Sequence, residues 1–317
     1  MRNPVVSIVT PCYNAANYLP AFIESIMNQS FQSWELIIVD DCSSDNSLQI
    51  CQEYTLKDAR IKVHQLQKNS GTCKLPRDTA VSLSKGEWIS ACDADDYIEE
   101  NFLSALIERQ AETGADIVCP KMVAFDENEN VVFTVPKEGF DYQCCYSAEE
   151  AFELTADGFN ICLAGALIKK DIWINGSTYL SGTFQHVSAK EYAEREMLSM
   201  ARKVACKNVR YMYRQHSESI CHNTKTAWEF SITAEKVLEL AKARYGSHSH
   251  SYSLALCSFI RKVEFSIRNI LKQNGTIPEA LKNMARKITT MTILRSELKL
   301  SKKFRYTLEF YKWNRQL

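Results

Sequence analysis

Residues 88–96 read W-I-S-A-C-D-A-D-D, and residues 35–41 read E-L-I-I-V-D-D. In both segments an apolar run of strand length is followed at once by acidic residues. A short apolar run with β-branched residues is typical of a strand that is buried on both faces. The two segments therefore predict buried strands whose ends carry Asp93 and Asp41.

The surrounding segments alternate between strand and helix patterns. Residues 5–9 and 61–66 predict two further strands. Apolar residues at helical spacing predict helices between the strands, at residues 18–27, 43–51, 74–83 and 102–109. This alternation is typical of an α/β fold, in which a Rossmann-like, mostly parallel sheet has helices on both faces. Ligands of such sheets bind beyond the carboxyl ends of the strands, where the acidic residues lie.

The second half of the chain has a less regular pattern. Apolar segments at residues 122–125 and 131–134 flank a polar turn and predict an exposed hairpin. The other elements expected are strands at 164–168 and 209–213, and helices at 191–203, 227–245, 254–273 and 279–288. We therefore divide the chain into a domain of residues 1–224 and a basic, mainly helical region of residues 225–317.

The composition is that of a folded soluble protein, with 45% hydrophobic and 24% charged residues. Basic and acidic residues balance at 38 each, but the helical region holds 18 basic against 7 acidic residues, so the first domain has the opposite imbalance. No segment resembles a signal peptide, and no apolar run approaches the ~20 residues of a membrane span. The 12 cysteines form no C-x-x-C pair and favour reduced core thiols. We expect a cytoplasmic protein without a membrane span.

The pair Asp93 and Asp95 is the sharpest chemical motif. Residues two apart in an extended segment project to the same side, so the two carboxylates can share a site while Asp96 points elsewhere. Mg²⁺ and Mn²⁺ prefer carboxylate oxygen and keep several waters, so one or two carboxylates suffice. Such a cation stabilises the charge that develops on a departing nucleoside diphosphate. The alternative is an acidic turn that only ends a strand.

Other residues at the predicted edge suit a nucleoside and its phosphates. Asp41 can accept a hydrogen bond from a base, or it can be a turn or helix-cap residue. Pro11 and Tyr13 can flank or stack on that base, and Asn14 follows them in the same turn. Arg77, with the loop at residues 68–72, adds a cation suited to a diphosphate.

Several motifs together resemble the family 2 glycosyltransferases, whose nucleotide-binding domain has the GT-A fold. The resemblance extends from residue 5 to about residue 220. It is carried by V-V-S-I-V-T-P-C-Y-N-A-A-N-Y-L at residues 5–19, S-I-M-N-Q-S-F at 25–31, E-L-I-I-V-D-D-C-S-S-D-N-S at 35–47, K-G-E-W-I-S-A-C-D-A-D-D-Y-I at 85–98 and Y-M-Y-R-Q-H-S-E-S-I at 211–220.

The resemblance implies a role for several positions. Pro11, Tyr13 and Asp41 would hold the nucleoside, Asp93 the ribose region and Asp95 the metal. It also implies inversion at the anomeric carbon by a carboxylate base that deprotonates the acceptor hydroxyl.

The sequence departs from the family pattern in three places. The phosphate loop reads G-T-C-K-L-P-R-D-T-A at residues 71–80, which keeps Arg77 but puts Asp78 where the family has Asn. The usual E-D pair of the base is replaced by Lys190 and Glu191. We predict Glu191 as the base, with Glu194 and Glu196 as alternatives. The non-functional alternative is that these glutamates only form the solvent-exposed face of a helix. No Q-x-x-R-W motif is present, which argues against a processive synthase.

The helical region interleaves basic and apolar residues, as in Phe259, Ile260, Arg261, Lys262 and Val263. Helices of this kind can lie on anionic membranes, at the inner face of the cell membrane in this case, or can pack on an acidic domain. No nucleic-acid reading module is present, so we expect no nucleic-acid partner.

The sequence thus predicts an inverting, Mg²⁺- or Mn²⁺-dependent transferase. It would move a sugar from a nucleotide donor, UDP-linked by expectation, to a glycan or lipid-linked acceptor in surface polysaccharide or glycoconjugate synthesis. The alternative is a non-catalytic relative that binds the donor but has lost its base. A pyrophosphorylase and a dinucleotide oxidoreductase are disfavoured, because the glycine-rich loops that they need are missing.

Overall fold

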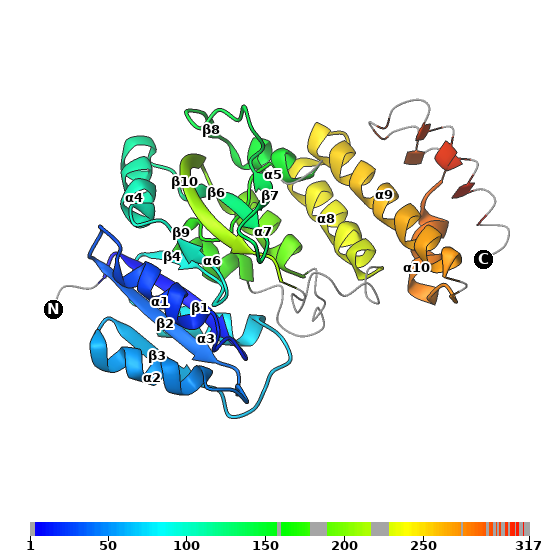
Figure 1. Ribbon diagram of the computed structural model, residues 1–317. Helices are drawn as coiled ribbons and strands as arrows, with labels where there is room; N and C mark the ends of the chain where they lie inside the picture. Colours follow the sequence, from blue (N-terminus) through cyan, green and yellow to red (C-terminus); the bar gives the residue numbers. More distant parts are fainter. Residues whose placement is uncertain are drawn as a thin grey trace.

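A computed structural model gives the architecture of the chain (Figure 1). It describes residues 4–156, 160–177, 189–216, 228–273 and 275–289, together with scattered residues between 292 and 313. One part is built around a single sheet, and the helices α8, α9 and α10 lie beside it toward the C-terminus. The predicted boundary between the two parts, at residue 224, lies outside the described residues.

The first four strands of the alternating pattern lie next to one another in the sheet. They run in the order β3-β2-β1-β4, and every pair among them is parallel. Their bounds are β1 Val6–Cys12, β2 Trp34–Asp40, β3 Ile61–Gln65 and β4 Trp88–Ala91. Parallel order requires that the loops after these strands meet at one edge of the sheet, as the sequence predicted.

Beyond β4 the sheet is mixed. It continues in the order β9-β6-β10-β5, and only β6 and β10 pair in parallel. The bounds are β5 Tyr97–Ile98, β6 Ile117–Phe125, β9 Leu167–Lys169 and β10 Val204–Arg214. The predicted hairpin is confirmed: β7 (Val131–Val135) pairs antiparallel with β6 around a turn that Asp126 stabilises by accepting bonds from the Asn128 and Asn130 amides. A short strand, β8 (Cys145–Tyr146), lies on β10.

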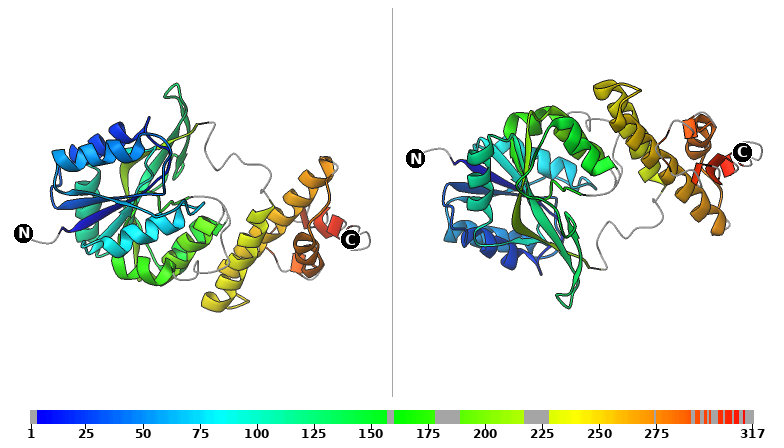
Figure 2. Two further views of the ribbon diagram at one scale, coloured as in Figure 1. Left: turned by 90° about the horizontal axis from the view of Figure 1, so that it is seen from below. Right: turned by 90° about the horizontal axis from the view of Figure 1, so that it is seen from above.

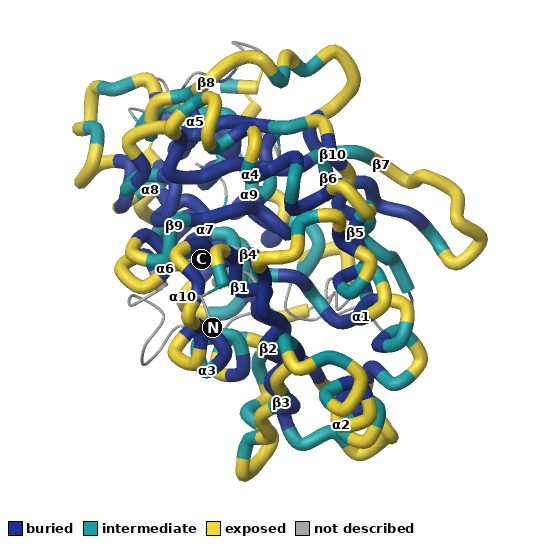
Figure 3. Tube along the Cα trace, turned by 90° about the vertical axis from the view of Figure 1, so that its left-hand side faces the viewer, coloured by how far each residue is buried: buried dark blue, intermediate teal, exposed yellow. Residues whose placement is uncertain are grey.

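Helices cover both faces of the sheet (Figure 2). One apolar core lies under α1 (Leu19–Met27), α2 (Ser47–Lys57) and α4 (Phe102–Thr113). The other lies under α3 (Lys74–Leu83), α5 (Ala148–Ala156), α6 (Lys170–Ser177) and α7 (Ala189–Met200). The central strands β1, β2 and β4 are buried along almost their whole length, whereas much of the β7 hairpin is exposed (Figure 3). This explains why these strands have mostly apolar sequences without alternation between apolar and polar residues.

The helical region packs on the sheet domain. The helices α8 (Glu229–Tyr245), α9 (His250–Lys272) and α10 (Glu279–Lys287) lie close to their predicted ranges. A shared core joins α8 and α9 to α5 and α7, and contains Phe152, Tyr192, Val237, Leu240, Ala241 and Ala255. The packing alternative is therefore confirmed for α8 and α9, whereas α10 packs on α9.

One expectation about α9 is corrected. Phe259, Ile260 and Val263, which were candidates for lipid contact, are buried in the helical core, because α10 and the later segments cover that face. Phe265 remains exposed on α9. Membrane contact stays a prediction that would have to rest on the basic outer face. None of the helices in the described part of the chain has the length and apolar character needed to span a membrane.

The described cysteines are buried, half-buried (Cys42 and Cys162) or exposed. Six of them are buried, as a set of core thiols would be: Cys12, Cys51, Cys92, Cys119, Cys206 and Cys257. Cys73, Cys144 and Cys145 are exposed, so the core interpretation does not hold for them.

Candidate active site

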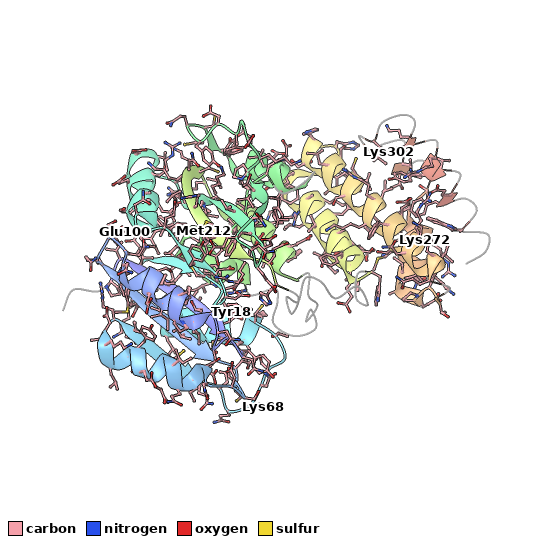
Figure 4. All side chains as sticks on the ribbon, in the orientation of Figure 1. Tyr18, Lys68, Glu100, Met212, Lys272 and Lys302 are labelled. Carbon is pink, nitrogen blue, oxygen red and sulfur yellow. The ribbon has the colours of Figure 1, made fainter. Side chains whose placement is uncertain are left out.

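The predicted site lies at the carboxyl edge of the parallel strands. Tyr18 and Lys68, labelled in Figure 4, come from the segments that follow β1 and β3 at this edge. Tyr13 follows β1 and is 54% exposed, as a side chain that stacks on a base should be. Pro11 is within β1 itself and half-buried. Both residues lie at this edge of the sheet, and their contact with a base stays a prediction.

Asp93 pairs with Arg77 at this edge. A guanidinium nitrogen of Arg77, on α3, lies 2.6 Å from Oδ1 of Asp93, and the side chains are 12% and 30% exposed. Burial opposes the charge of Arg77, but the negative potentials of Cys73 and Asp93 outweigh it and raise its pKa. The structure thus brings together two residues that the sequence assigned separately to ribose and diphosphate.

Asp96 is buried and connects the acidic segment at residues 93–96 to β10. The Tyr211 hydroxyl on β10 donates to Asp96 at 2.6 Å and accepts the Asp93 amide at 3.0 Å, and the Arg214 amide also donates to Asp96. Burial, with the nearby carboxylates of Asp95 and Asp93, raises the pKa of Asp96 well above its usual range. The prediction that Asp96 points away from the ligand side agrees with this buried position.

His216 is the residue that sequence reasoning missed. Its Nε2 lies 3.0 Å from Oδ2 of Asp95, and its ring stacks on Tyr18 with centroids 5.2 Å apart. Nδ1 is buried without a hydrogen-bond partner among the described residues. The pairing of β10 with β5 brings His216 close to Asp95, although 121 positions separate them. The motif at residues 211–220 includes His216, and its position just past a strand was the available signal.

Asp95 and His216 fit a divalent cation as a partial ligand set. One carboxylate oxygen and one imidazole nitrogen lie close enough to share a metal ion, and diphosphate oxygens and waters are the ligands that Mg²⁺ or Mn²⁺ takes to complete its shell. Within the described ranges no group of three or more His, Cys, Asp or Glu side chains could hold a metal alone. The geometry suits a cation that binds together with a phosphate ligand.

Asp41 and Asn14 hold neighbouring loops. Both carboxylate oxygens of Asp41 accept from Ser70, one from its amide and one from its hydroxyl, each at 2.8 Å. The side-chain oxygen of Asn14 accepts from the Ser44 amide at 2.8 Å. Asp45, rather than Asp41, accepts hydrogen bonds at the start of α2, from the amide and the hydroxyl of Ser47. Asp41 therefore shapes the loop at residues 68–72, and base contact by Asp41 or Asn14 stays a prediction.

Glu191 lies in the first turn of α7 and is paired. Its Oε2 lies 2.6 Å from Nζ of Lys262 on α9 and 3.7 Å from a guanidinium nitrogen of Arg195. The alternatives Glu194 and Glu196 are both buried, and burial raises the pKa of Glu196. The structure places Glu191 in an ion-pair cluster and does not join it to Asp93 or Asp95 through any contact among the described residues.

Comparison with known proteins gives the family. The model of Glycosyl transferase family 2 matches residues 7–173. Glycosyltransferase GlyG of Streptococcus pneumoniae is 36% identical over 137 residues, which are 43% of this chain and 45% of GlyG. The poly(ribitol-phosphate) β-N-acetylglucosaminyltransferase TarS of Staphylococcus aureus is 36% identical over 118 residues, which are 37% of this chain and 20% of TarS. This chain therefore spans less than half the length of these curated relatives.

The fold agrees with a solved relative. The crystal structure of S. aureus TarS residues 1–349 in complex with UDP matches with a TM-score of 0.69 at 18% identity, over 97% of this chain and 89% of that chain. The predicted GT-A fold with a helical C-terminal region is confirmed by this match. Since the family model covers more than half of the chain, including the Asp93–Asp95 segment, this protein belongs to glycosyl transferase family 2.

Proposed function

We propose that this protein transfers a sugar from a nucleoside diphosphate donor to a hydroxyl group of an acceptor, with inversion at the anomeric carbon. The observation that carries the proposal is the meeting of Arg77, Asp93, Asp95 and His216 at the carboxyl edge of β4 in a family 2 chain. A UDP-linked donor is the favoured choice, because the solved TarS neighbour binds UDP. A glycan or lipid-linked acceptor in surface polysaccharide synthesis follows from the same relative, which is named for glycosylating poly(ribitol phosphate).

Asp95 and His216 would hold Mg²⁺ or Mn²⁺ in this function. The cation supplies Lewis-acid stabilisation of the departing diphosphate. Tyr18 restrains the His216 ring by stacking, and Tyr211 with Asp96 fixes the backbone that carries Asp93 and Asp95. Arg77 orients Asp93 and adds positive charge on the diphosphate side.

Glu191→Gln separates the enzyme from the non-catalytic alternative. The amide cannot accept the acceptor proton, so turnover is expected to fall by about a hundred-fold or more, while donor binding stays unchanged. Initial rates and calorimetric titration of the donor measure the two effects. Glu196→Gln removes an alternative base on the same helix and is expected to keep turnover, whereas a loss of turnover in this variant alone would transfer the assignment to Glu196. Unchanged turnover in Glu191→Gln would remove the base assignment.

Thermal stabilisation by nucleotides tests the donor site directly. A ligand that binds only the folded state raises its stability, by about 2.7 kcal/mol at a hundred times its dissociation constant. UDP, GDP, CMP and dTDP would each be added with Mn²⁺ and with a chelator. We expect UDP with Mn²⁺ to raise Tm, and the chelator to remove most of the increase. If no nucleotide shifts Tm under either condition, the proposed function is wrong.

A further inference from the structure

The ion pair between Glu191 and Lys262 joins the sheet domain to the helical region. Glu191 lies in the first turn of α7, and Lys262 lies near the middle of α9. The Lys262 ammonium donates to Oε2 of Glu191 at 2.6 Å. The two side chains are only 29% and 15% exposed, so water screens the pair less than it screens a surface pair.

The scaffold around this pair fixes the position of Lys262. Tyr192, next to Glu191, is buried in the core that α5 and α7 share with α8 and α9. On the same face of α9, the Ser251 hydroxyl lies within hydrogen-bond distance of Glu149 and Glu153 on α5, at 2.7 and 2.9 Å. Apolar and polar contacts both hold α9 against α5 and α7. The backbone that carries Lys262 is therefore packed against the sheet domain.

Among the described residues, the charged groups around Glu191 contact only one of its two carboxylate oxygens. Oε2 faces Lys262 from α9 and, at 3.7 Å, Arg195 from its own helix. Arg195 is committed elsewhere, since it donates to the Glu191 carbonyl at 2.9 Å and to the Thr155 carbonyl on α5 at 2.7 Å. Glu194 is the further acidic group that acts on Arg195. Within the described residues no donor reaches Oε1 of Glu191, so Lys262 provides the one short contact to the carboxylate.

We propose that Lys262 is a positioning residue for the catalytic base, and that the helical region thereby completes the active site. Lys262 holds Oε2 and keeps Oε1 turned toward the acceptor hydroxyl. The inference rests on the proposed function and on Glu191 as the base. In the transfer step, the acceptor hydroxyl gives its proton to Oε1 while its oxygen forms a bond to the anomeric carbon. The bond from that carbon to the diphosphate breaks, and the diphosphate leaves with the electron pair.

The competing explanation is an interhelical ion pair that only stabilises the packing of α9 on α7. The two explanations differ in what Lys262→Met changes. A packing residue affects Tm alone. A positioning residue affects kcat, while the KM and Kd of the donor stay as they were, because the contacts of Lys262 within the described part of the chain are with Glu191 and Phe230 and not with the proposed donor residues.

The central experiment is a double-mutant cycle on turnover. Lys262→Met is expected to lower kcat about tenfold or more, because a misplaced base loses the benefit of orientation. Lys262→Arg is expected to restore most of the rate. In a Glu191→Gln background, Lys262→Met should cause no further loss.

Matched controls make each result decisive. Ser251→Ala weakens the same interface without touching Glu191, and kcat should stay within twofold of the unmodified protein. If Ser251→Ala and Lys262→Met lower kcat equally, or if Lys262→Met adds its full loss on top of Glu191→Gln, the positioning role is overturned. Calorimetric binding of UDP with Mn²⁺ is measured on every variant. Absent binding in the unmodified protein would mean failure of the proposed function, whereas intact binding with an unchanged kcat in Lys262→Met would mean failure of this inference alone.

Discussion

Asp95→Ala is expected to lower turnover by about a thousand-fold, which corresponds to about 4 kcal/mol of transition-state stabilisation. The substitution removes the carboxylate that lies 3.0 Å from His216 and leaves the imidazole as the only remaining protein ligand of that pair. The fold should be unaffected, because the Asp95 side chain is 31% exposed and Asp96 carries the buried anchoring contacts. Initial rates over a Mn²⁺ titration measure the effect, and Tm in the absence of nucleotide checks the fold.

A surface carboxylate provides the control for this prediction. Glu127 is exposed at the tip of the β6–β7 hairpin, and Glu127→Ala is expected to change neither rate nor metal dependence. His216→Ala should reproduce part of the loss and raise the Mn²⁺ concentration needed for half-maximal rate. Full, metal-dependent turnover in Asp95→Ala would contradict the assignment of Asp95 to the cation.

Gly165→Ala is expected to destabilise the protein by about 3 kcal/mol, the sum of left-handed backbone strain and overpacking. Gly165 has a φ of +67°, and a Cβ there would lie 2.3 Å from Cδ2 of Tyr211. Tyr211 is fully buried and cannot yield without releasing Asp96 and the Asp93 amide. For a domain of this size class Tm changes by roughly 2–4 °C per kcal/mol, so we expect a fall of roughly 6 °C or more.

Gly114→Ala separates strain from the steric clash. Gly114 ends α4 with a φ of +64°, close to that of Gly165, but no atom lies within 4 Å of its added Cβ. Its expected cost is the backbone strain alone, about 1 kcal/mol. Calorimetric unfolding of both variants measures the difference. Equal losses at the two positions would show that the Tyr211 ring adapts, and the rigid link from β10 to the acidic segment would then be wrong.

Local sequence patterns predicted the parts of this fold that local rules determine. The strand at residues 88–91 is mostly apolar because it is central and buried on both faces, and so it could be recognised. The short strands β5 and β8 have two residues each, which is too few to show a period. The apolar face of α9 was recognised as such, but its sequence is the same whether lipid or protein covers it.

The same limit applies to the candidate site. Asp93 and Asp95 could be found because they directly follow a buried strand. The contact of His216 with Asp95 depends on how β10 lies in the sheet, and no spacing rule connects positions 121 residues apart. The partner of Glu191 could not be predicted either, because Lys262 lies in the helical region, and the sequence gives no sign of how that region packs on the sheet domain.

The core that α5 and α7 share with α8 and α9 determines which segments must be exchanged together in recombination between related transferases. A fragment cut after β10 would expose Phe152 and Tyr192 to water as an oily surface, and such surfaces promote aggregation. Recombination between related transferases at the end of β10 would therefore join two mismatched surfaces. A chimera that is meant to exchange the helical region should therefore include α5 and α7, so that both sides of the shared core come from the same protein.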